Sequence, residues 1–233
     1  MTNFDLLKQQ VAEHALQYVR TGMVLGIGSG STARYLVYGL AERLRDGRLR
    51  DVVGVATSEA TAALCRERGV PLETLAERPH LDLAIDGADE IDPSLNLIKG
   101  LGGALLREKI VAASADQFIV IADDSKLVGQ LGTRAPLPVE VIEFGLPLAK
   151  QRLSDLGCAP ELRRAADGGP FRTDEGNVIL DCRFAGIADA TALNAAINAI
   201  PSVVEHGLFI NMASVALVAG AAGVTTMVRA KER

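Results

Sequence analysis

The stretch MVLGIGSGST, residues 23–32, is the strongest indication of the fold in this sequence. Met23–Ile27 is a short apolar run that predicts a buried strand, and a helical pattern follows it through about Leu44. The small residues Gly28–Thr32 predict a tight turn that carries the chain from the strand into the helix. These segments together predict one strand–loop–helix unit of a parallel sheet.

The same alternation continues through the first half of the chain. We expect further strands at 52–56, 81–85 and 118–122, and helices at 5–20, 60–68 and 103–113. The predicted strands are apolar throughout instead of alternating, which is typical of parallel sheets covered on both faces. The first half therefore predicts an α/β fold with a Rossmann-like open parallel sheet covered by helices.

The pattern changes between Leu131 and Pro138, where Pro136 and Pro138 indicate a boundary. We then expect strands at 139–144, 161–165, 178–182 and 203–209, and helices at 147–156 and 190–200. This β-α-β-β-α-β order predicts a second, smaller ferredoxin-like α+β domain. The predicted domains are 1–130 plus 208–233 for the catalytic α/β domain and 131–207 for the ferredoxin-like domain.

Composition excludes several classes of protein. Of 233 residues, 48% are hydrophobic, which predicts a packed globular chain, and the net charge of −5 argues against a nucleic-acid partner. Cys65, Cys158 and Cys182 show no C-x-x-C spacing and the histidines are scattered, so we expect no metal site. Sparse cysteines and no visible signal peptide predict a cytoplasmic protein.

One uncharged stretch, residues 207–228, is long enough to cross a membrane. Asn211, Ser214 and two threonines interrupt it, and Gly220 and Gly223 divide it into pieces of strand length. We therefore expect buried strands here and no membrane partner.

The loop Gly26–Thr32 has the chemistry of a phosphate site. Glycines let backbone N–H groups approach an anion, the following helix points its N-terminus there, and Ser31 and Thr32 add hydroxyl groups. A plain turn with a Ser/Thr helix cap would look similar. A dinucleotide loop requires G-x-G-x-x-G, and Ser31 occupies its third glycine position.

The segment Asp86–Asp92, DGADEID, places four acids directly after a predicted buried strand. These acids could cap backbone groups of a solvated turn, bind a hard metal ion, or accept hydrogen bonds from sugar hydroxyls. We favour hydroxyl acceptors over a metal, because nearby Lys99 would compete with a cation.

The segment Lys99–Lys109 combines a lysine, a glycine-rich loop and the start of a helix. Glu108 lies two residues from both Leu106 and Ile110 and so points away from their apolar face, where it could reach a cleft. A surface carboxylate in the charged triplet 107–109 is the alternative. Lys126 follows the next predicted strand and is expected at the same sheet edge, where ligands bind in open parallel sheets, and a solvated surface lysine is the alternative.

Taken together, these segments resemble the ribose-5-phosphate isomerase A family nearly from end to end. The resemblance covers Gly28–Thr32, Asp86–Ile91, Ile98–Ile110 and Ala122–Lys126, and continues through 137–142, 176–181 and 198–201. It implies an aldose–ketose isomerase of the non-oxidative pentose phosphate pathway. Such an enzyme interconverts ribose 5-phosphate and ribulose 5-phosphate through an enediolate, needs no cofactor, and forms at least a homodimer, with the smaller domain as a plausible contact.

The resemblance also implies the role of each site residue. The family's catalytic glutamate falls on Glu108, its D-G-A-D motif on Asp86, Gly87, Ala88 and Asp89, and its K-G-G-G motif on Lys99, Gly100, Leu101 and Gly102. Its phosphate loop falls on Ser29, Gly30, Ser31 and Thr32, its distal lysine on Lys126, and an N-terminal lysine on Lys8. Leu101 stands where the family has a glycine, and Ser29 stands where threonine is common. The expected catalytic residues are Glu108, Lys99, Asp86 and Asp89.

Two other functions use similar elements. A sugar-phosphate sensor without turnover would have a similar pocket, but no helix-turn-helix module or basic arm is visible. A nicotinamide oxidoreductase requires an acidic residue after the second strand, where this chain has Thr57 and Ser58, and Glu59 fits that position poorly.

Overall fold

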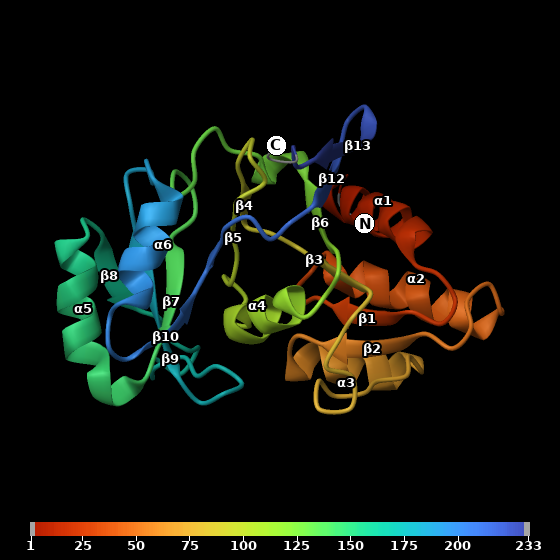
Figure 1. Cartoon of the computed structure of the whole chain (residues 1–233), viewed down its shortest axis with the longest axis horizontal. Coiled ribbons are helices and arrows are strands. Elements are labelled where there is room, and N and C mark those ends of the chain that lie inside the picture. Colours follow the sequence, from red (N-terminus) through yellow and green to blue (C-terminus); the bar gives the residue numbers. More distant parts are fainter. Residues whose placement is uncertain (1–2, 231–233) are drawn as a thin grey trace. The chain divides into compact units, whose positions relative to one another are not determined.

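The computed structural model describes residues 3–230, which form two compact units (Figure 1). Unit 1 spans residues 3–88, 107–126 and 211–230, and unit 2 spans residues 89–106 and 127–210. This division differs from the predicted domain bounds, 1–130 plus 208–233 and 131–207, mainly because residues 89–106 belong to unit 2.

Unit 1 contains a six-stranded sheet in the order β13-β12-β6-β3-β1-β2. Its strands are β1 (Val24–Ile27), β2 (Val53–Ala56), β3 (Leu83–Asp86), β6 (Phe118–Asp123), β12 (Val215–Gly220) and β13 (Gly223–Val228). Its helices are α1 (Asn3–Ala15), η1 (Leu16–Tyr18), α2 (Ala33–Arg45), α3 (Glu59–Arg68) and η2 (Asp124–Lys126), and α4 (Leu105–Ala113) begins in unit 2 and continues into unit 1.

The strand order gives unit 1 its ligand-binding edge. β1 pairs in parallel with β2 on one side and with β3 on the other, and β6 and β12 continue the parallel sheet beyond β3. The strand order therefore reverses between β1 and β3, and such a switch point is where open α/β sheets bind ligands. The sheet is parallel except for β13, which pairs antiparallel with β12 at the edge.

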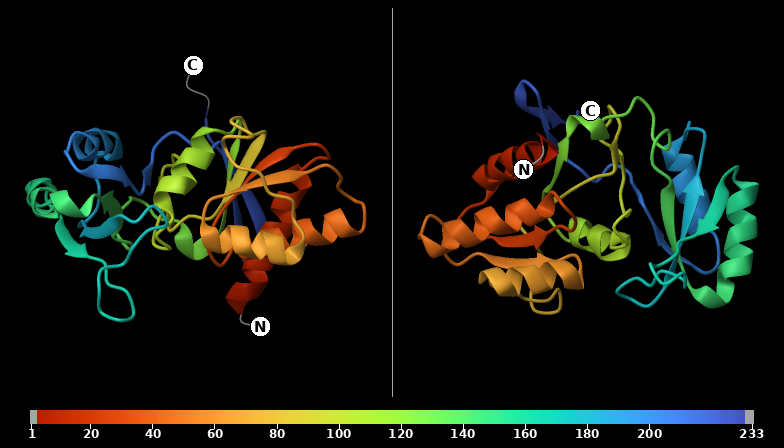
Figure 2. Two further views of the ribbon diagram at one scale, coloured as in Figure 1. Left: turned by 90° about the horizontal axis from the view of Figure 1, so that it is seen from below. Right: turned by 180° about the vertical axis from the view of Figure 1, so that it is seen from behind.

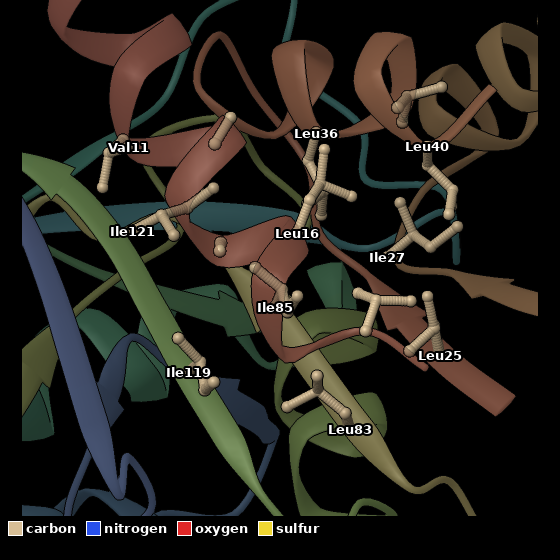
Figure 3. Close-up of a cluster of buried hydrophobic side chains, with 14 of the residues drawn as sticks. Val11, Leu16, Leu25, Ile27, Leu36, Leu40, Leu83, Ile85, Ile119 and Ile121 are labelled. Atoms are coloured by element: carbon tan, nitrogen blue, oxygen red, sulfur yellow. The ribbon is translucent and has the colours of Figure 1, made fainter. Parts of the chain in front are cut away.

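The core of unit 1 follows from the alternation of side chains along each strand. Leu25 and Ile27 of β1 pack with Leu36 and Leu40 of α2 on one face of the sheet (Figure 3). Gly26, between them, faces the opposite side, where an added Cβ would lie 2.5 Å from a side-chain carbon of Val111 in α4. Helices thus cover both faces of the sheet, as the apolar strands predict.

Unit 2 has the predicted ferredoxin-like plan. Its four-stranded sheet has the order β10-β7-β9-β8 with every pair antiparallel. Its elements are β7 (Leu137–Val141), η3 (Glu143–Gly145), α5 (Leu146–Asp155), β8 (Ala159–Leu162), β9 (Val178–Arg183), α6 (Ala190–Asn198) and β10 (Val203–His206). Helices α5 and α6 pack on one face of this sheet, against Val139 and Leu180 among others (Figure 2).

A three-stranded sheet, β11-β5-β4, explains why residues 89–106 belong to unit 2. Its strands are β4 (Glu90–Ile91), β5 (Leu97–Ile98) and β11 (Leu208–Phe209). β5 pairs with β11, which directly follows the last strand of the ferredoxin-like sheet. Glu90 strengthens this attachment, because its carboxylate accepts hydrogen bonds from the backbone N–H groups of Gly132, Arg134 and Ala135.

The predicted strands 139–144 and 161–165 are shifted to 137–141 and 159–162, and the predicted helix 5–20 spans 3–15 with a 3-10 turn after it. Two further predicted elements differ for identifiable reasons. The predicted strand 203–209 is interrupted at Gly207, where an added Cβ would lie 2.2 Å from the carbonyl oxygen of Lys99. The predicted helix 103–113 begins only at Leu105, because Gly103 has a φ of +85°, which no helical residue adopts.

The uncharged stretch 207–228 forms strands β11, β12 and β13. β11 and β12 are buried, as predicted, whereas the edge strand β13 is largely exposed. Within residues 3–230, no helix is long and apolar enough to cross a membrane.

Candidate active site

The switch point of unit 1 brings Asp86 against the loop that follows β1. The Asp86 Oδ1 atom accepts hydrogen bonds from the backbone N–H groups of Ser29 and Gly87, at 3.0 and 2.7 Å. Gly28 makes this approach possible, because an added Cβ there would lie 2.1 Å from the same oxygen. The side chain of Asp86 is 3% exposed, so a fixed carboxylate lies directly beside the phosphate-type loop.

A cluster of hydroxyl groups supports the loop from the end of β2. The Ser29 Oγ atom lies 2.7 Å from both Thr57 Oγ1 and Ser58 Oγ, and 3.1 Å from Thr61 Oγ1. Thr61 also donates to the carbonyl oxygen of Gly28. The Ser29 hydroxyl is thus part of an internal network. Thr57, Ser58 and Thr61 were not among the predicted site residues, although a polar pair at a strand exit was a visible signal.

The tip of the loop presents the predicted anion donors. Gly30 has a φ of +95°, a conformation that favours glycine. Ser31 is exposed, and its Oγ accepts a hydrogen bond of 2.9 Å from the Lys8 Nζ atom of α1. Thr32 is the N-cap residue of α2, but its side chain makes no cap hydrogen bond. That observation disfavours the alternative of a plain Ser/Thr-capped turn.

Lys126 lies at the end of η2, directly after the carboxyl end of β6. The turn is held by Asp123, which is 3% exposed and whose Oδ1 accepts hydrogen bonds from the backbone N–H and the hydroxyl of Ser125. Since β6 is the neighbour of β3, Lys126 belongs to the same sheet edge as Asp86.

Glu108 is buried, which contradicts the alternative of a surface carboxylate in a charged triplet. Its side chain is only 7% exposed, whereas Ile110, two residues further along α4, is 44% exposed. The buried face of α4 consists of Leu105, Glu108, Val111 and Ala112. The expectation that Leu106 and Ile110 define the apolar face was therefore wrong, and the helix instead carries its carboxylate inward.

The four acids of the segment 86–92 have separate tasks. Asp92 accepts hydrogen bonds from the backbone N–H groups of Ser94 and Asn96, and so holds its own turn. Glu90 is 1% exposed and holds the backbone of residues 132–135. Among residues 3–230, no group of three or more His, Cys, Asp or Glu side chains is arranged to hold a metal ion.

In unit 2, Asp89 contacts the loop that follows Lys99. The backbone N–H of Asp89 donates to the carbonyl oxygen of Ile98, and Asp89 Oδ2 accepts a hydrogen bond of 3.0 Å from the N–H of Leu101. Asp89, Lys99 and Leu101 are thus brought together within this unit, as Ser29, Asp86 and Lys8 are arranged within unit 1.

Lys99 is one of the few buried cations of the structure. Its side chain is 2% exposed, and its Nζ atom lies 5.4 Å from the centre of the Phe209 ring, within the range of a cation–π interaction. The Lys99 backbone N–H donates to the carbonyl oxygen of Gly207. A desolvated ammonium group is costly unless paired, and such cations are typical of sites that stabilise a developing negative charge.

The departure at Leu101 is compatible with the loop geometry. Gly100 and Gly103 have φ values of +99° and +85°, whereas Leu101 is not among the residues with positive φ. The Leu101 side chain is 41% exposed, and its backbone N–H and carbonyl are both hydrogen-bonded. The loop therefore requires glycine at 100 and 103, and not at 101.

A separate cavity of about 450 Å³ lies in unit 1 between α3, the segment 72–77 and α4. None of the predicted site residues lines it. Glu59 lies on its wall and pairs with Arg107 at 2.8 Å, so the carboxylate that fitted a nicotinamide ribose poorly is already paired.

Comparisons with known proteins identify the family of this chain. The family model of ribose 5-phosphate isomerase A (phosphoriboisomerase A) matches residues 53–223. A curated ribose-5-phosphate isomerase A from Roseiflexus sp. (strain RS-1) is 63% identical over 223 residues, covering 96% of each chain.

Two solved structures are similar over nearly the whole chain. A D-ribose-5-phosphate isomerase in complex with phospho-erythronic acid is 39% identical, with a TM-score of 0.96, and covers 98% of this chain and 100% of its own. Ribose 5-phosphate isomerase A from Methanocaldococcus jannaschii is 41% identical, with a TM-score of 0.92, and covers 96% and 99% of the two chains. The chain belongs to the ribose 5-phosphate isomerase A family.

Proposed function

We propose that this chain interconverts D-ribose 5-phosphate and D-ribulose 5-phosphate through an enediolate, in the non-oxidative pentose phosphate pathway, with Glu108 as the base. The observation that carries the assignment of the base is the burial of Glu108 between two charged neighbours, since a surface carboxylate would be exposed. Family membership supports the reaction, and a similar solved enzyme binds phospho-erythronic acid, a phosphorylated sugar acid.

The phosphate binds at the loop after β1. Ser31 and Thr32 supply hydroxyl groups, Gly30 and the N-terminus of α2 supply backbone N–H groups, and Lys8 and Lys126 supply positive charge. In this proposal Ser29 mainly shapes the loop and its hydroxyl contributes less to phosphate binding, because that hydroxyl is hydrogen-bonded to Thr57 and Ser58. Anchoring the remote phosphate holds the reacting carbons in place, which is how remote binding energy promotes a reaction.

The Glu108 carboxylate removes the proton from C2 of the open-chain aldose and returns it to C1, giving the ketose. One carboxylate serves both carbons because they are adjacent. The O1 and O2 oxygens exchange one proton in the same reaction, so the sugar gains and loses none overall. Positioned proton transfer of this kind contributes about 10²–10⁴-fold to the rate.

Lys99 stabilises the oxygen charge of the enediolate, together with backbone N–H groups of the Gly100–Gly102 loop. Its burial strengthens this interaction, because charges interact more strongly away from water. Asp86 and Asp89 accept hydrogen bonds from the sugar hydroxyls.

The test is to incubate ribose 5-phosphate with protein treated exhaustively with EDTA and to separate the two pentose phosphates. The proposal predicts full interconversion. Tight substrate binding without turnover would instead support a sugar-phosphate sensor. Activity that is lost with EDTA and restored by Mg²⁺ or Mn²⁺ would show that the acidic segment works with a metal ion.

A homodimer is part of this proposal. Unit 2 exposes three large apolar side chains within seven residues: Ile142 at 52%, Phe144 at 97% and Leu148 at 43%. A second copy of the chain is the occupant that family resemblance favours for this surface. Light scattering should report a dimer for the native chain and a monomer for Phe144→Asp, and a native monomer at micromolar concentration would refute the assignment.

We also assign the enzyme to the cytoplasm. Cys65, Cys158 and Cys182 are all free and buried, which suits a reducing compartment, and both pentose phosphates are metabolites of central carbohydrate metabolism. Cell fractionation of the source organism tests this assignment.

A further inference from the structure

We propose that Arg163, held by Asp181, is a positioning residue of the isomerase site that fixes the orientation of the Leu101–Gly102 peptide. The inference rests on the proposed function of the Lys99 loop. It concerns Asp181 of β9 and Arg163, which directly follows β8, and both lie more than 60 positions along the chain from that loop. Every contact that supports the inference lies within unit 2.

Each of the three nitrogens of the Arg163 guanidinium group donates a hydrogen bond. Its Nε and Nη2 atoms donate to the two carboxylate oxygens of Asp181, and Nη1 donates to the carbonyl oxygens of Gly100 and Leu101 at 3.1 and 3.0 Å. The side chain is only 12% exposed. A half-buried bidentate pair whose arginine also donates to two successive carbonyls is a specific arrangement and not a surface ion pair.

The pairing of β8 and β9 in the four-stranded sheet positions the Arg163 guanidinium group. Glu161 of β8 is the register partner of Asp181 on β9, and Arg163, two residues further, projects to the same face as Glu161. The Arg163 backbone is bonded on both sides, from its N–H to the Ile179 carbonyl and from the Phe171 N–H to its own carbonyl. The helices α5 and α6 cover the other face, which includes Leu180 and Cys182.

Because peptides are planar and trans, the contacts of the two carbonyls also determine where the neighbouring N–H groups point. The carbonyl and the N–H of one peptide point in opposite directions. The Gly100 carbonyl points to Arg163, and the N–H of Leu101 in the same peptide accordingly points to Asp89, 3.0 Å from its Oδ2. The Leu101 carbonyl also points to Arg163, so the N–H of Gly102 is directed to the side of the loop on which Asp89 lies.

The surroundings of Gly102 agree with a donor that faces a ligand. A Cβ added at Gly102 would meet no atom within 4 Å, whereas one at Gly103 would lie 2.5 Å from the Phe171 ring. Phe171 also lies under the Arg163 guanidinium, at 5.7 Å from its ring centre. Arg163 and Phe171 thus support one side of the loop, and the Gly102 N–H is presented on the open side.

Lysine could not replace this group. Its ammonium is a point charge, whereas the planar guanidinium bonds a carboxylate with two parallel donors and still has others for the carbonyls. Loss of Arg163 would leave the Leu101–Gly102 peptide able to rotate, and a displacement of about 1 Å in a catalytic group costs about 100-fold in rate.

Steady-state kinetics of Arg163→Ala with ribose 5-phosphate test the proposal. We expect kcat to fall by about 10–100-fold, with KM and the inhibition constant of inorganic phosphate changed less than about threefold, because the phosphate binds in unit 1. Arg163→Lys should not restore kcat. The matched control is Arg164→Ala, which removes a neighbouring, exposed arginine whose Nη1 bonds the carbonyl of Gly168, and which should keep native kcat.

Guanidinium ion, added below denaturing concentration, should raise the kcat of Arg163→Ala several-fold and leave the native enzyme unchanged. Asp181→Asn, which keeps the arginine but loosens it, should show an intermediate loss even if Arg163→Ala does not fold. Native kcat in folded Arg163→Ala or Asp181→Asn, or an equal loss in kcat and in phosphate affinity, would overturn the positioning role. A native enzyme without isomerase activity would instead refute the proposed function itself.

Discussion

Two glycine-rich loops of this protein have the same appearance in the sequence and are held in different ways. The loop 28–32 of unit 1 is fixed by its immediate surroundings, namely the Ile85 carbonyl of β3, the carboxylate of Asp86 on the same strand, and short hydroxyl side chains. The loop 99–103 of unit 2 is fixed by side chains from two other segments, with Asp89 on one side and Arg163, from more than 60 residues further along the chain, on the other.

The difference reflects the chemistry proposed for each loop. A phosphate is bound by many N–H and O–H groups at once, so a loop placed at a switch point of the sheet has most of what it needs. An enediolate requires a cation and a backbone donor in a single orientation, and an isolated turn does not provide that rigidity. Lys99 is only 2% exposed, and the loop after it is hydrogen-bonded to Asp89 on one side and to Arg163 on the other.

The largest effect is expected where the second loop meets the reacting atoms. Lys99→Met keeps the length and apolar stem of the side chain but removes its charge, and kcat should fall by about 10²–10³-fold, as on removal of an oxyanion donor. Steady-state kinetics with ribose 5-phosphate measure this change. A loss below about tenfold, in a variant with native melting temperature, would contradict the role of Lys99.

The loop 28–32 should be most sensitive to substitution at Gly28, where its backbone lies closest to Asp86. Gly28→Ala places a methyl group 2.1 Å from Asp86 Oδ1, so the loop or Asp86 must move. We expect a destabilisation of about 1–3 kcal/mol and at least about a tenfold loss of kcat/KM. Gly129→Ala is the control, since an added Cβ there meets nothing within 4 Å. Equal stability and activity of the two variants would refute the account of this loop.

Leu101→Gly tests whether the activity of the enzyme depends on the side chain at this position of the loop 99–103. Because only the Leu101 backbone is bonded within the loop and its φ is not positive, kcat and KM should change less than about threefold. Stability should fall by about 0.5–1 kcal/mol, because glycine is more flexible in the unfolded chain. A larger kinetic change would show that the leucine side chain contacts the substrate.

The smallest effect concerns Glu140 of β7, which is buried like Glu90 and Glu108, and activity should not change. Burial raises the pKa of Glu140, although Asn177 and Thr173 donate hydrogen bonds to its Oε1 atom. The folded protein therefore keeps a proton that the unfolded chain releases, and stability falls as pH rises from about 4 through the raised pKa.

Glu140→Gln cannot ionise, so its melting temperature relative to the native protein should rise with pH over that window. Thermal unfolding at about pH 4 and about pH 7 measures the difference. A difference in melting temperature that stays constant with pH would show that Glu140 keeps its ordinary pKa. A large loss of kcat would show that Glu140, like Glu108, is needed for the reaction.

The sequence was sufficient for the features that depend on local pattern and topology. Apolar runs and their spacing predicted the parallel sheet and the β-α-β-β-α-β order of unit 2, and strand ends predicted where Asp86 and the loop 28–32 lie. The antiparallel edge strand β13 and the attachment of residues 89–106 to unit 2 were not predicted, because both depend on pairing between distant segments.

Side-chain burial was the main feature that local pattern did not reveal. Periodicity placed Ile110 inward and left Glu108 open to a surface interpretation, and the structure has the reverse exposure. Arg163 and Asp181 looked like ordinary charged residues of two strands, since nothing near them in the sequence indicates that they contact the Lys99 loop. Only the folded sheet brings these groups within hydrogen-bonding distance.

The most direct test of the account is hydrogen exchange at the reacting carbons in Glu108→Gln. In D₂O, the native enzyme should exchange substrate hydrogen at C1 and C2 with solvent as it interconverts the two pentose phosphates, which NMR follows directly. Glu108→Gln should slow exchange and turnover together by about 10²–10⁴-fold, while inorganic phosphate binds with native affinity. Exchange at the native rate in this variant would show that another group carries the proton.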